Sequence, residues 1–149
     1  MKQAIVLVLM SILVSACKSK VYTLENYPNR KITFGNGGGF TGMTDTYVLF
    51  ENGQLFNRQS MVGGEMQALL NLEKTLVKQI FENFYTLKLH QSILNDPGNM
   101  TFFVKMEGPE AVHSLKWGGP NQEANPNIVQ YYRNLYALGK LQKQQPIKR

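Results

Sequence analysis

The fold of this chain is decided by residues 44–56, which read TDTYVLFENGQLF. The first half of this stretch is rich in β-branched and aromatic side chains, the types that fit the pleated surface of a strand. Asn52 and Gly53 then separate it from the apolar pair of Leu55 and Phe56. Because Asn and Gly both tolerate positive φ, the stretch predicts a tight turn between two antiparallel strands.

Upstream, residues 31–34 predict a further short strand, which runs into Gly35, Asn36, Gly37, Gly38 and Gly39. Glycine loses more backbone entropy on ordering than any other residue, so we expect this run to be a turn or loop. Gly37, Gly39 and Gly42 have the Gly-x-Gly-x-x-Gly spacing of dinucleotide sites. That motif delivers a pyrophosphate to a helix N-terminus, whereas a predicted strand follows here, so phosphate binding is not expected.

The same loop is predicted to be a contact surface for another protein. Its glycine backbone lets a partner approach closely, and Phe40 would supply an apolar anchor. The predicted surface consists of Gly37, Gly38, Gly39, Phe40, Thr41 and Gly42.

Downstream of Met66 the apolar period changes. Apolar residues recur every three or four positions, at Leu69, Leu72, Leu76, Ile80 and Phe84, which predicts an amphipathic helix. Turn residues at 95–98 predict a chain reversal, and residues 100–106 and 111–117 predict a second hairpin.

Asn125 followed by Pro126 is typical of a helix start, with Asn as the cap and Pro in the first turn. The apolar stripe of this closing helix consists of Ile128, Tyr131, Tyr132, Leu135 and Leu138.

The predicted order is strand, strand, strand, helix, strand, strand, helix. Strands joined in hairpins pair antiparallel, and the helices must then cover one face of the sheet. The sequence therefore predicts a single α+β domain over residues 30–141, with an antiparallel sheet of about five strands packed against two helices.

The N-terminus predicts export. Lys2 precedes an apolar run at residues 4–14, and Ser15 and Ala16 are small enough for cleavage by a signal peptidase. We therefore expect residues 1–16 to be a signal peptide.

Cys17, the chain's single cysteine, completes a motif that resembles the lipobox of bacterial lipoproteins, in which the thiol is acylated. We expect lipidation at Cys17, a tether over residues 17–29 and stable attachment to a membrane. The absence of Asp after Cys17 favours the outer membrane, with the domain facing the periplasm.

The formal net charge of +6 at pH 7 falls to +5 once Lys2 leaves with the signal peptide. Much of the remaining excess lies near the C-terminus, and we expect residues 142–149 to form a solvated basic tail. Because the protein is expected to be exported, nucleic acid is not an expected partner.

An aromatic group near the C-terminus offers an alternative ligand site. Trp117, Tyr131 and Tyr132 could line a glycan or small-molecule site together with His113, although tyrosines at helical spacing more often pack in a core. Alternation places His113 on the same strand face as Leu115, which favours a partly buried imidazole over a catalytic one.

No catalytic arrangement is predicted. His90 and His113 lack the spacing and the neighbouring carboxylates of a zinc site, and nothing in the sequence pairs Asp45 with Asp96. There is no Gly-x-Ser-x-Gly elbow, and the cysteine is expected to carry lipid. We expect no metal, no cofactor and no enzymatic activity, and a hydrolase that uses His113 is the least favoured alternative.

The run Gly38, Gly39, Phe40, Thr41 and Gly42, with the predicted elements around it, resembles the emfourin-type proteins. These are small bacterial inhibitors of thermolysin-like metalloproteases, and the resemblance covers roughly residues 31–138. It implies that the partner is a protease. The leading expectation is a non-enzymatic lipoprotein that binds another envelope protein, and a glycan- or small-molecule-binding lipoprotein is the alternative.

Overall fold

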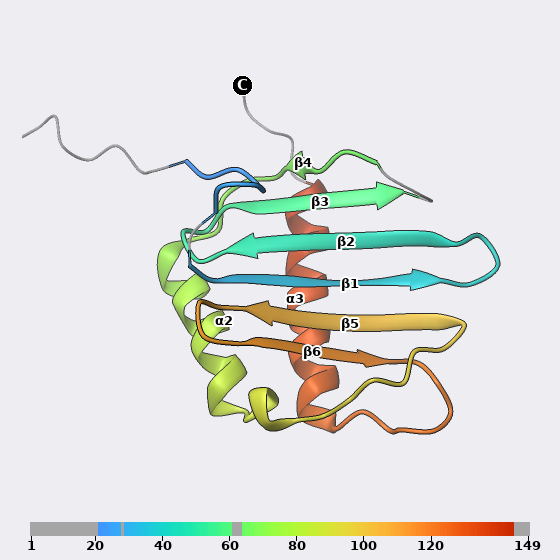
Figure 1. Ribbon diagram of the computed structural model, residues 1–149. Coiled ribbons are helices and arrows are strands. Elements are labelled where there is room, and N and C mark those ends of the chain that lie inside the picture. Colours follow the sequence, from blue (N-terminus) through green and yellow to red (C-terminus); the bar gives the residue numbers. More distant parts are fainter. Residues whose placement is uncertain (1–20, 28, 61–63, 145–149) are drawn as a thin grey trace, which may run out of the picture.

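The computed structural model describes residues 21–27, 29–60 and 64–144 (Figure 1). The described chain contains β1 (Lys31–Gly38), β2 (Met43–Phe50), β3 (Leu55–Ser60), β4 (Gln67–Ala68), α2 (Lys74–Thr86), a 3-10 turn (Leu89–Gln91), β5 (Met100–Glu107), β6 (Val112–Trp117) and α3 (Pro126–Gln144). The predicted signal peptide (residues 1–16), Cys17 and residues 145–149 lie outside the described residues.

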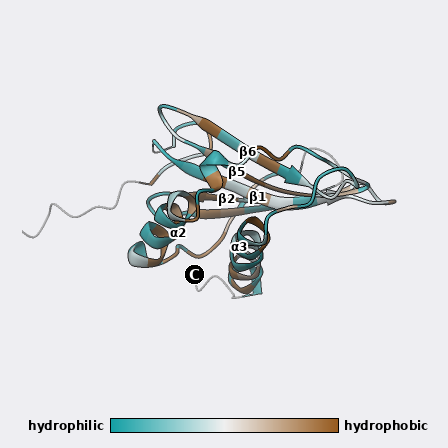
Figure 2. Cartoon of the chain, turned by 90° about the horizontal axis from the view of Figure 1, so that it is seen from below, coloured by the Kyte–Doolittle hydropathy of each residue, from teal (hydrophilic) through white to brown (hydrophobic). Residues whose placement is uncertain are grey.

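The strands form one sheet in the order β4-β3-β2-β1-β5-β6, and every neighbouring pair is antiparallel. Both helices lie on the same side of this sheet (Figure 2). The predicted α+β fold with an antiparallel sheet and two helices is confirmed, and β4 adds a short strand that the sequence did not indicate.

The core lies between the sheet and the helices. Alternate positions of the strands point toward the helices, as the period of two residues requires. The sheet contributes Ile32, Phe34, Tyr47, Leu49, Leu55, Val104, Met106 and Leu115, and the helices contribute Val77, Ile80, Phe81, Phe84, Ile128, Tyr131 and Leu135.

The hairpin predicted around Asn52 and Gly53 is confirmed. Gly53 has a φ of 96° and donates its N–H to the carbonyl of Phe50 at 3.0 Å, which closes the turn between β2 and β3. The start of α3 is also confirmed, because the Asn125 side chain accepts a hydrogen bond from the N–H of Asn127 at 2.9 Å and Pro126 is the first helical residue.

The glycine run is where the sequence-based expectation was wrong. Residues 35–38 are not a loop but the second half of β1, and they pair with β2 on one side and β5 on the other. Cross-strand hydrogen bonds on both sides offset the entropy that the glycines lose. A Cβ at Gly35 would collide with the carbonyl oxygen of Asp45, so this position has no room for a side chain.

The first helix begins later than the period of Leu69 and Leu72 predicts. The N–H of Leu69 bonds to the carbonyl of Leu55 in β3 at 2.8 Å, and that of Leu72 bonds to the carbonyl of Gly53 in the preceding turn at 2.9 Å. Both residues therefore lie along β3 and its turn, outside the helix. Helix α2 starts only at Lys74, after Glu73 caps it by accepting from the N–H of Thr75 at 3.2 Å.

Both ends of the described chain contact the domain. In the segment predicted as a tether, the N–H of Tyr22 donates to Gln54 Oε1 at 2.7 Å, and Tyr27 stacks on Phe50 with ring centroids 5.9 Å apart. Helix α3 continues to Gln144, into the segment predicted as a basic tail, and Lys143 Nζ donates to Gln59 Oε1 at 2.8 Å.

Within the described part of the chain, no helix combines the length and the apolar character needed to cross a membrane.

Candidate functional site

The turn between β1 and β2 projects beyond the rest of the sheet (Figure 1). Gly38, Gly39 and Gly42 have φ values of 110°, 71° and 62°, which side-chain-bearing residues rarely adopt. The N–H of Gly39 bonds to the carbonyl of Asn99 at 2.5 Å, and a Cβ at Gly38 would collide with the same oxygen. The glycines therefore hold the turn against the start of β5.

Phe40 at the tip of this turn is fully exposed to solvent. Two further apolar side chains near the same end are open, Met43 with 37% and Met100 with 42% of their surface exposed. The Met100 methyl group also lies close to Gly39, 3.5 Å from the position that a Cβ would take there. The end of the hairpin thus carries an exposed apolar group, which we call the hairpin tip, of Phe40, Met43 and Met100.

Behind the hairpin tip, on the helix side of the sheet, Asp45 is held by hydrogen bonds. Its Oδ1 accepts from Asn57 Nδ2 at 2.8 Å, and its Oδ2 accepts from the hydroxyl of Tyr136 at 2.8 Å and from that of Tyr47 at 3.4 Å. Lys143 Nζ lies 3.9 Å from Oδ1 and adds an ion pair. Three donors and one cation compensate the burial of this carboxylate.

A hollow of about 440 Å³ opens between Asp45 and the hairpin tip. We call it the hairpin cleft, and it is lined by Asn36, Gly38, Thr41, Met43, Thr44, Asp45, Gln59, Met100, Tyr136, Lys140, Lys143 and Gln144. The ammonium of Lys140 lies 5.5 Å from the ring centroid of Tyr136, so two lysines of α3 border this cleft.

Tyr47 and Tyr136 donate their hydroxyl protons to Asp45, whereas the hydroxyl of Tyr132 accepts from Asn36 Nδ2 at 3.1 Å. Burial raises the pKa of Tyr132 to about 12, and burial together with the negative charge of Asp45 raises the pKa of Tyr47. Burial is also the main cause that raises the pKa of Tyr136. The Tyr136 hydroxyl and the fixed Asp45 carboxylate give the cleft a rigid polar lining, which suits recognition of a partner's polar groups.

Sequence reasoning found the tip but missed the cleft. Lys140 and Lys143 fall within the basic C-terminal part of the sequence, and no sequence pattern connects them to Asp45. Tyr136, Lys140 and Lys143 recur at helical spacing, so the signal that places them on one face of α3 was present in the sequence. The sequence does not indicate which strands these three residues face.

The residues of the predicted aromatic ligand site are brought together, but in the core. Trp117 packs edge-on against Tyr132, with ring centroids 5.2 Å apart, and Tyr131 donates its hydroxyl to the carbonyl of Ile80 at 3.0 Å. All three side chains are buried, Trp117 on β6 and the two tyrosines on the face of α3 that packs on the core. Burial raises the pKa of Tyr131.

The fold also brings His90 and His113 together, although they are distant in the sequence. Their ring centroids lie 6.1 Å apart, and His113 packs beside Phe84 at 6.0 Å. The buried Nδ1 of His90 has no hydrogen-bond partner among the described residues. Within those residues, no three His, Cys, Asp or Glu side chains come close enough to hold a metal ion.

Asp96, the second aspartate, stabilises a loop. Its carboxylate accepts from the N–H of Asn121 at 2.7 Å, from Asn121 Nδ2 at 3.1 Å and from the N–H of Gln122 at 2.9 Å. Hydrogen bonds from the Asn121 side chain and the Gln122 backbone hold the pKa of Asp96 below its usual value. Asp45 and Asp96 thus belong to separate structural clusters.

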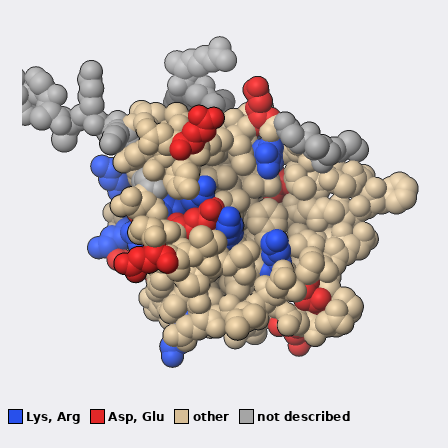
Figure 3. All heavy atoms as spheres, viewed as in Figure 1, with Lys and Arg blue, Asp and Glu red and all other residues tan. Residues whose placement is uncertain are grey.

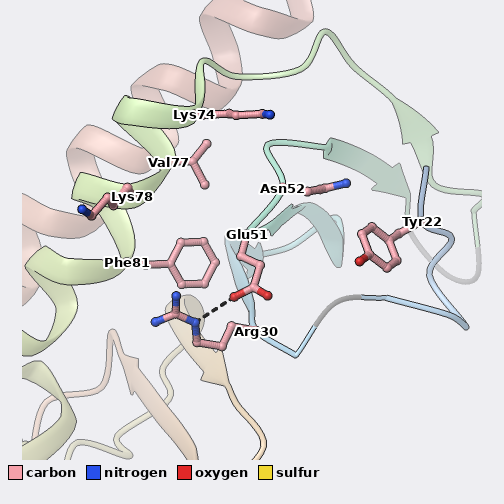
Figure 4. A pocket seen from close by; sticks show the side chains of 8 residues that line it. All are labelled: Tyr22, Arg30, Glu51, Asn52, Lys74, Val77, Lys78 and Phe81. Carbon is pink, nitrogen blue, oxygen red and sulfur yellow. Dashed lines mark hydrogen bonds and ion pairs between the residues drawn. The ribbon is translucent and has the colours of Figure 1, made fainter. Parts of the chain in front are cut away.

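A second hollow, of about 450 Å³, lies at the end of the sheet opposite the hairpin tip (Figure 4). Arg30 Nε donates to Glu51 Oε2 at 2.8 Å, and the guanidinium lies 5.3 Å from the ring centroid of Phe81. Tyr22 lines the same hollow, so this site fastens the N-terminal segment to the domain.

No protein-family model matches the chain, and no curated protein matches it significantly. The fold and the candidate site define an α+β domain that presents an exposed apolar hairpin tip beside a polar cleft.

Proposed function

We propose that the chain is a lipid-anchored protein of the bacterial envelope whose domain binds another protein without catalysing a reaction. The observation that carries the proposal is Phe40, a large apolar side chain that is fully exposed on a glycine-held turn. Isolated apolar residues are common on protein surfaces, but Phe40 has Met43 and Met100 beside it and a polar cleft behind it.

This combination supports a protein partner. Protein interfaces concentrate their binding free energy in a few aromatic or apolar anchors that polar contacts surround. Phe40 would enter a pocket of the partner, while Lys140 and Lys143 would face its carboxylates. The resemblance to emfourin-type proteins supports a thermolysin-like metalloprotease as the first partner to test.

Photo-crosslinking in intact cells tests the proposed partner site. A benzophenone side chain replaces Phe40 in one variant and Ile93 in the other, since Ile93 is another exposed apolar residue, with 94% of its surface open. We expect a discrete crosslinked protein from position 40 only. Identical products from both positions, or none from position 40, would refute the proposed partner site.

Purified thermolysin-like protease tests the proposed class of partner. We expect the wild-type chain to inhibit it and Phe40→Ala to inhibit it at least tenfold less, since an interface anchor contributes about 2 kcal/mol or more. Inhibition that is equal in both chains would place the contact elsewhere.

The proposed anchor is tested at Cys17. Metabolic labelling with a radioactive fatty acid should label the wild-type chain and not the Cys17→Ser chain, because the acyl chains are attached to this thiol. An intact mass without acyl chains would disprove lipidation.

A further inference from the structure

The face of the sheet opposite the helices is not covered by any described helix (Figure 2). We call it the open face. Its side chains alternate with core residues along every strand: Lys105 lies between Val104 and Met106, and Lys116 lies between Leu115 and Trp117.

Over the strands of this face the cations outnumber the carboxylates, most of which lie toward the margins (Figure 3). Its charged side chains on the strands are Lys31, Arg58, Lys105, Lys116 and Glu107. Glu107 is shared by two of the cations, Lys105 at 3.0 Å and Lys31 at 3.5 Å. Among the described strand residues of the open face, four are cations and one is a carboxylate.

The cross-strand register gives the open face a defined layout. One row runs across five strands through Arg58, Thr46, Gly35, Phe103 and Lys116, each paired with the next. Strands lie about 4.8 Å apart, so Arg58 and Lys116 are about 19 Å from each other at the two ends of the row. Between them the Phe103 ring lies against Gly35.

The open face is also hollowed. Gly37, Thr44, Thr101, Phe103, Pro97 and Lys116 line a depression of about 410 Å³. Gly37 has no side chain to fill it, so a small anionic group could lie beside the Lys116 ammonium.

The N-terminal segment approaches the margin of the same face. Tyr27 stacks on Phe50, which alternates with the core residue Leu49, and Lys31 Nζ lies 3.8 Å from the centroid of the Tyr27 ring. Four peptide units connect Val21, the first described residue, to Cys17, so they span at most about 14 Å. Val21 borders the end of the sheet at Asn52 and Gln54, so a lipid on Cys17 would keep that end near the bilayer.

We infer that the open face lies on an anionic phospholipid bilayer. The inference rests on the proposed lipid anchor, and charge complementarity and the approach of the N-terminal segment both favour this occupant. In this orientation the helices face away from the membrane and the hairpin tip extends alongside it. The proposed partner would then meet Phe40 in the aqueous layer next to the membrane.

Vesicle co-sedimentation tests this inference separately from the proposed function. The mature chain, residues 17–149 carrying Cys17→Ser, has neither the lipid nor the apolar signal segment, and it is mixed with vesicles of phosphatidylcholine alone or with one quarter phosphatidylglycerol. We expect binding to the anionic vesicles only. Substituting Arg58→Gln with Lys116→Gln should weaken it about 25-fold, about fivefold for each charge removed.

A matched control removes the same charges from the helix layer. Lys78→Gln with Arg133→Gln alters exposed residues of α2 and α3, and circular dichroism verifies that both double variants fold. We expect the control to bind anionic vesicles within about twofold of the parent, because both helices lie on the side away from the bilayer.

Three results would overturn the inference: equal weakening by both double variants, no binding to anionic vesicles, or equal binding to neutral ones. Tighter binding to dissolved heparin than to vesicles would instead identify the open face as a site for an anionic polysaccharide. The crosslinking at Phe40 does not depend on any of these results, so the two proposals can fail independently.

Discussion

The hydroxyl of Tyr136 donates a hydrogen bond to Oδ2 of Asp45 across 2.8 Å, although 91 residues separate them in the chain. This bond joins α3 to β2 at the back of the hairpin cleft. It therefore links the stability of the domain to the geometry of the proposed binding site.

Tyr136→Phe should reduce the free energy of unfolding by about 1.5 kcal/mol, because a hydrogen bond to a charged acceptor contributes about that much. Urea denaturation measures the loss. Tyr27→Phe is the matched control, since it removes the hydroxyl of a ring that is partly exposed, and it should leave the midpoint unchanged. Equal losses in both variants would show that the Tyr136 hydroxyl has no special role.

Gly139→Ala should destabilise the domain although alanine is the better helix former. Alanine would gain about 1 kcal/mol of helix propensity. Its Cβ would lie 2.8 Å from the buried ring of Tyr47, which itself stacks on Phe34, and overpacking of this kind costs about 1 to 3 kcal/mol. Ala137→Gly, at an exposed position of α3, measures propensity alone, and a more stable Gly139→Ala protein would contradict the close approach.

Asp96→Asn should lower the melting temperature at pH 7. The hydrogen bonds to the carboxylate depress its folded-state pKa, so their stabilisation is complete above the unfolded pKa of about 3.9. It is lost as the pH falls through the lower, folded-state pKa. The difference in melting temperature between wild type and variant should therefore shrink below about pH 4, and a difference that stays constant down to pH 2 would refute this role.

Phe40→Ala should leave the free energy of unfolding within about 0.5 kcal/mol of wild type, because the side chain is fully exposed. Phe34→Ala, in contrast, empties a buried core position and should cost about 3 to 5 kcal/mol. Thermal or urea unfolding of both variants provides the comparison. A strongly destabilised Phe40→Ala protein would mean that the tip packs against the domain.

The fluorescence of Trp117 should change little when ligands are added. It is buried, stacked on Phe102 with ring centroids 5.9 Å apart and edge-on against Tyr132. We expect emission at shorter wavelengths than that of free tryptophan and weak quenching by iodide. A saturable change in emission on adding a glycan would revive the alternative in which Trp117 lines a ligand site.

Local patterns in the sequence predicted the elements that local chemistry controls. Asn52 and Gly53 form the predicted turn, and Asn125 with Pro126 starts the predicted helix. The prediction of a loop at the glycine run was wrong because these residues are held as a strand by hydrogen bonds to β2 and β5. No pattern within the run itself indicates those bonds. The prediction that Leu69 and Leu72 are helical was wrong for a similar reason, because their N–H groups bond to the distant carbonyls of Leu55 and Gly53.

The sequence by itself determined the antiparallel α+β class and the position of Phe40 in a glycine turn, because alternation, turn residues and helix caps act over a few neighbouring residues. Only the tertiary structure decided that β1 lies in the middle of the sheet, that Tyr136 and Lys143 meet Asp45, and that four cations share the face without helices. The physical reason is that these contacts join segments far apart in the chain, which come together only through strand order, strand register and the packing of α3 on the sheet.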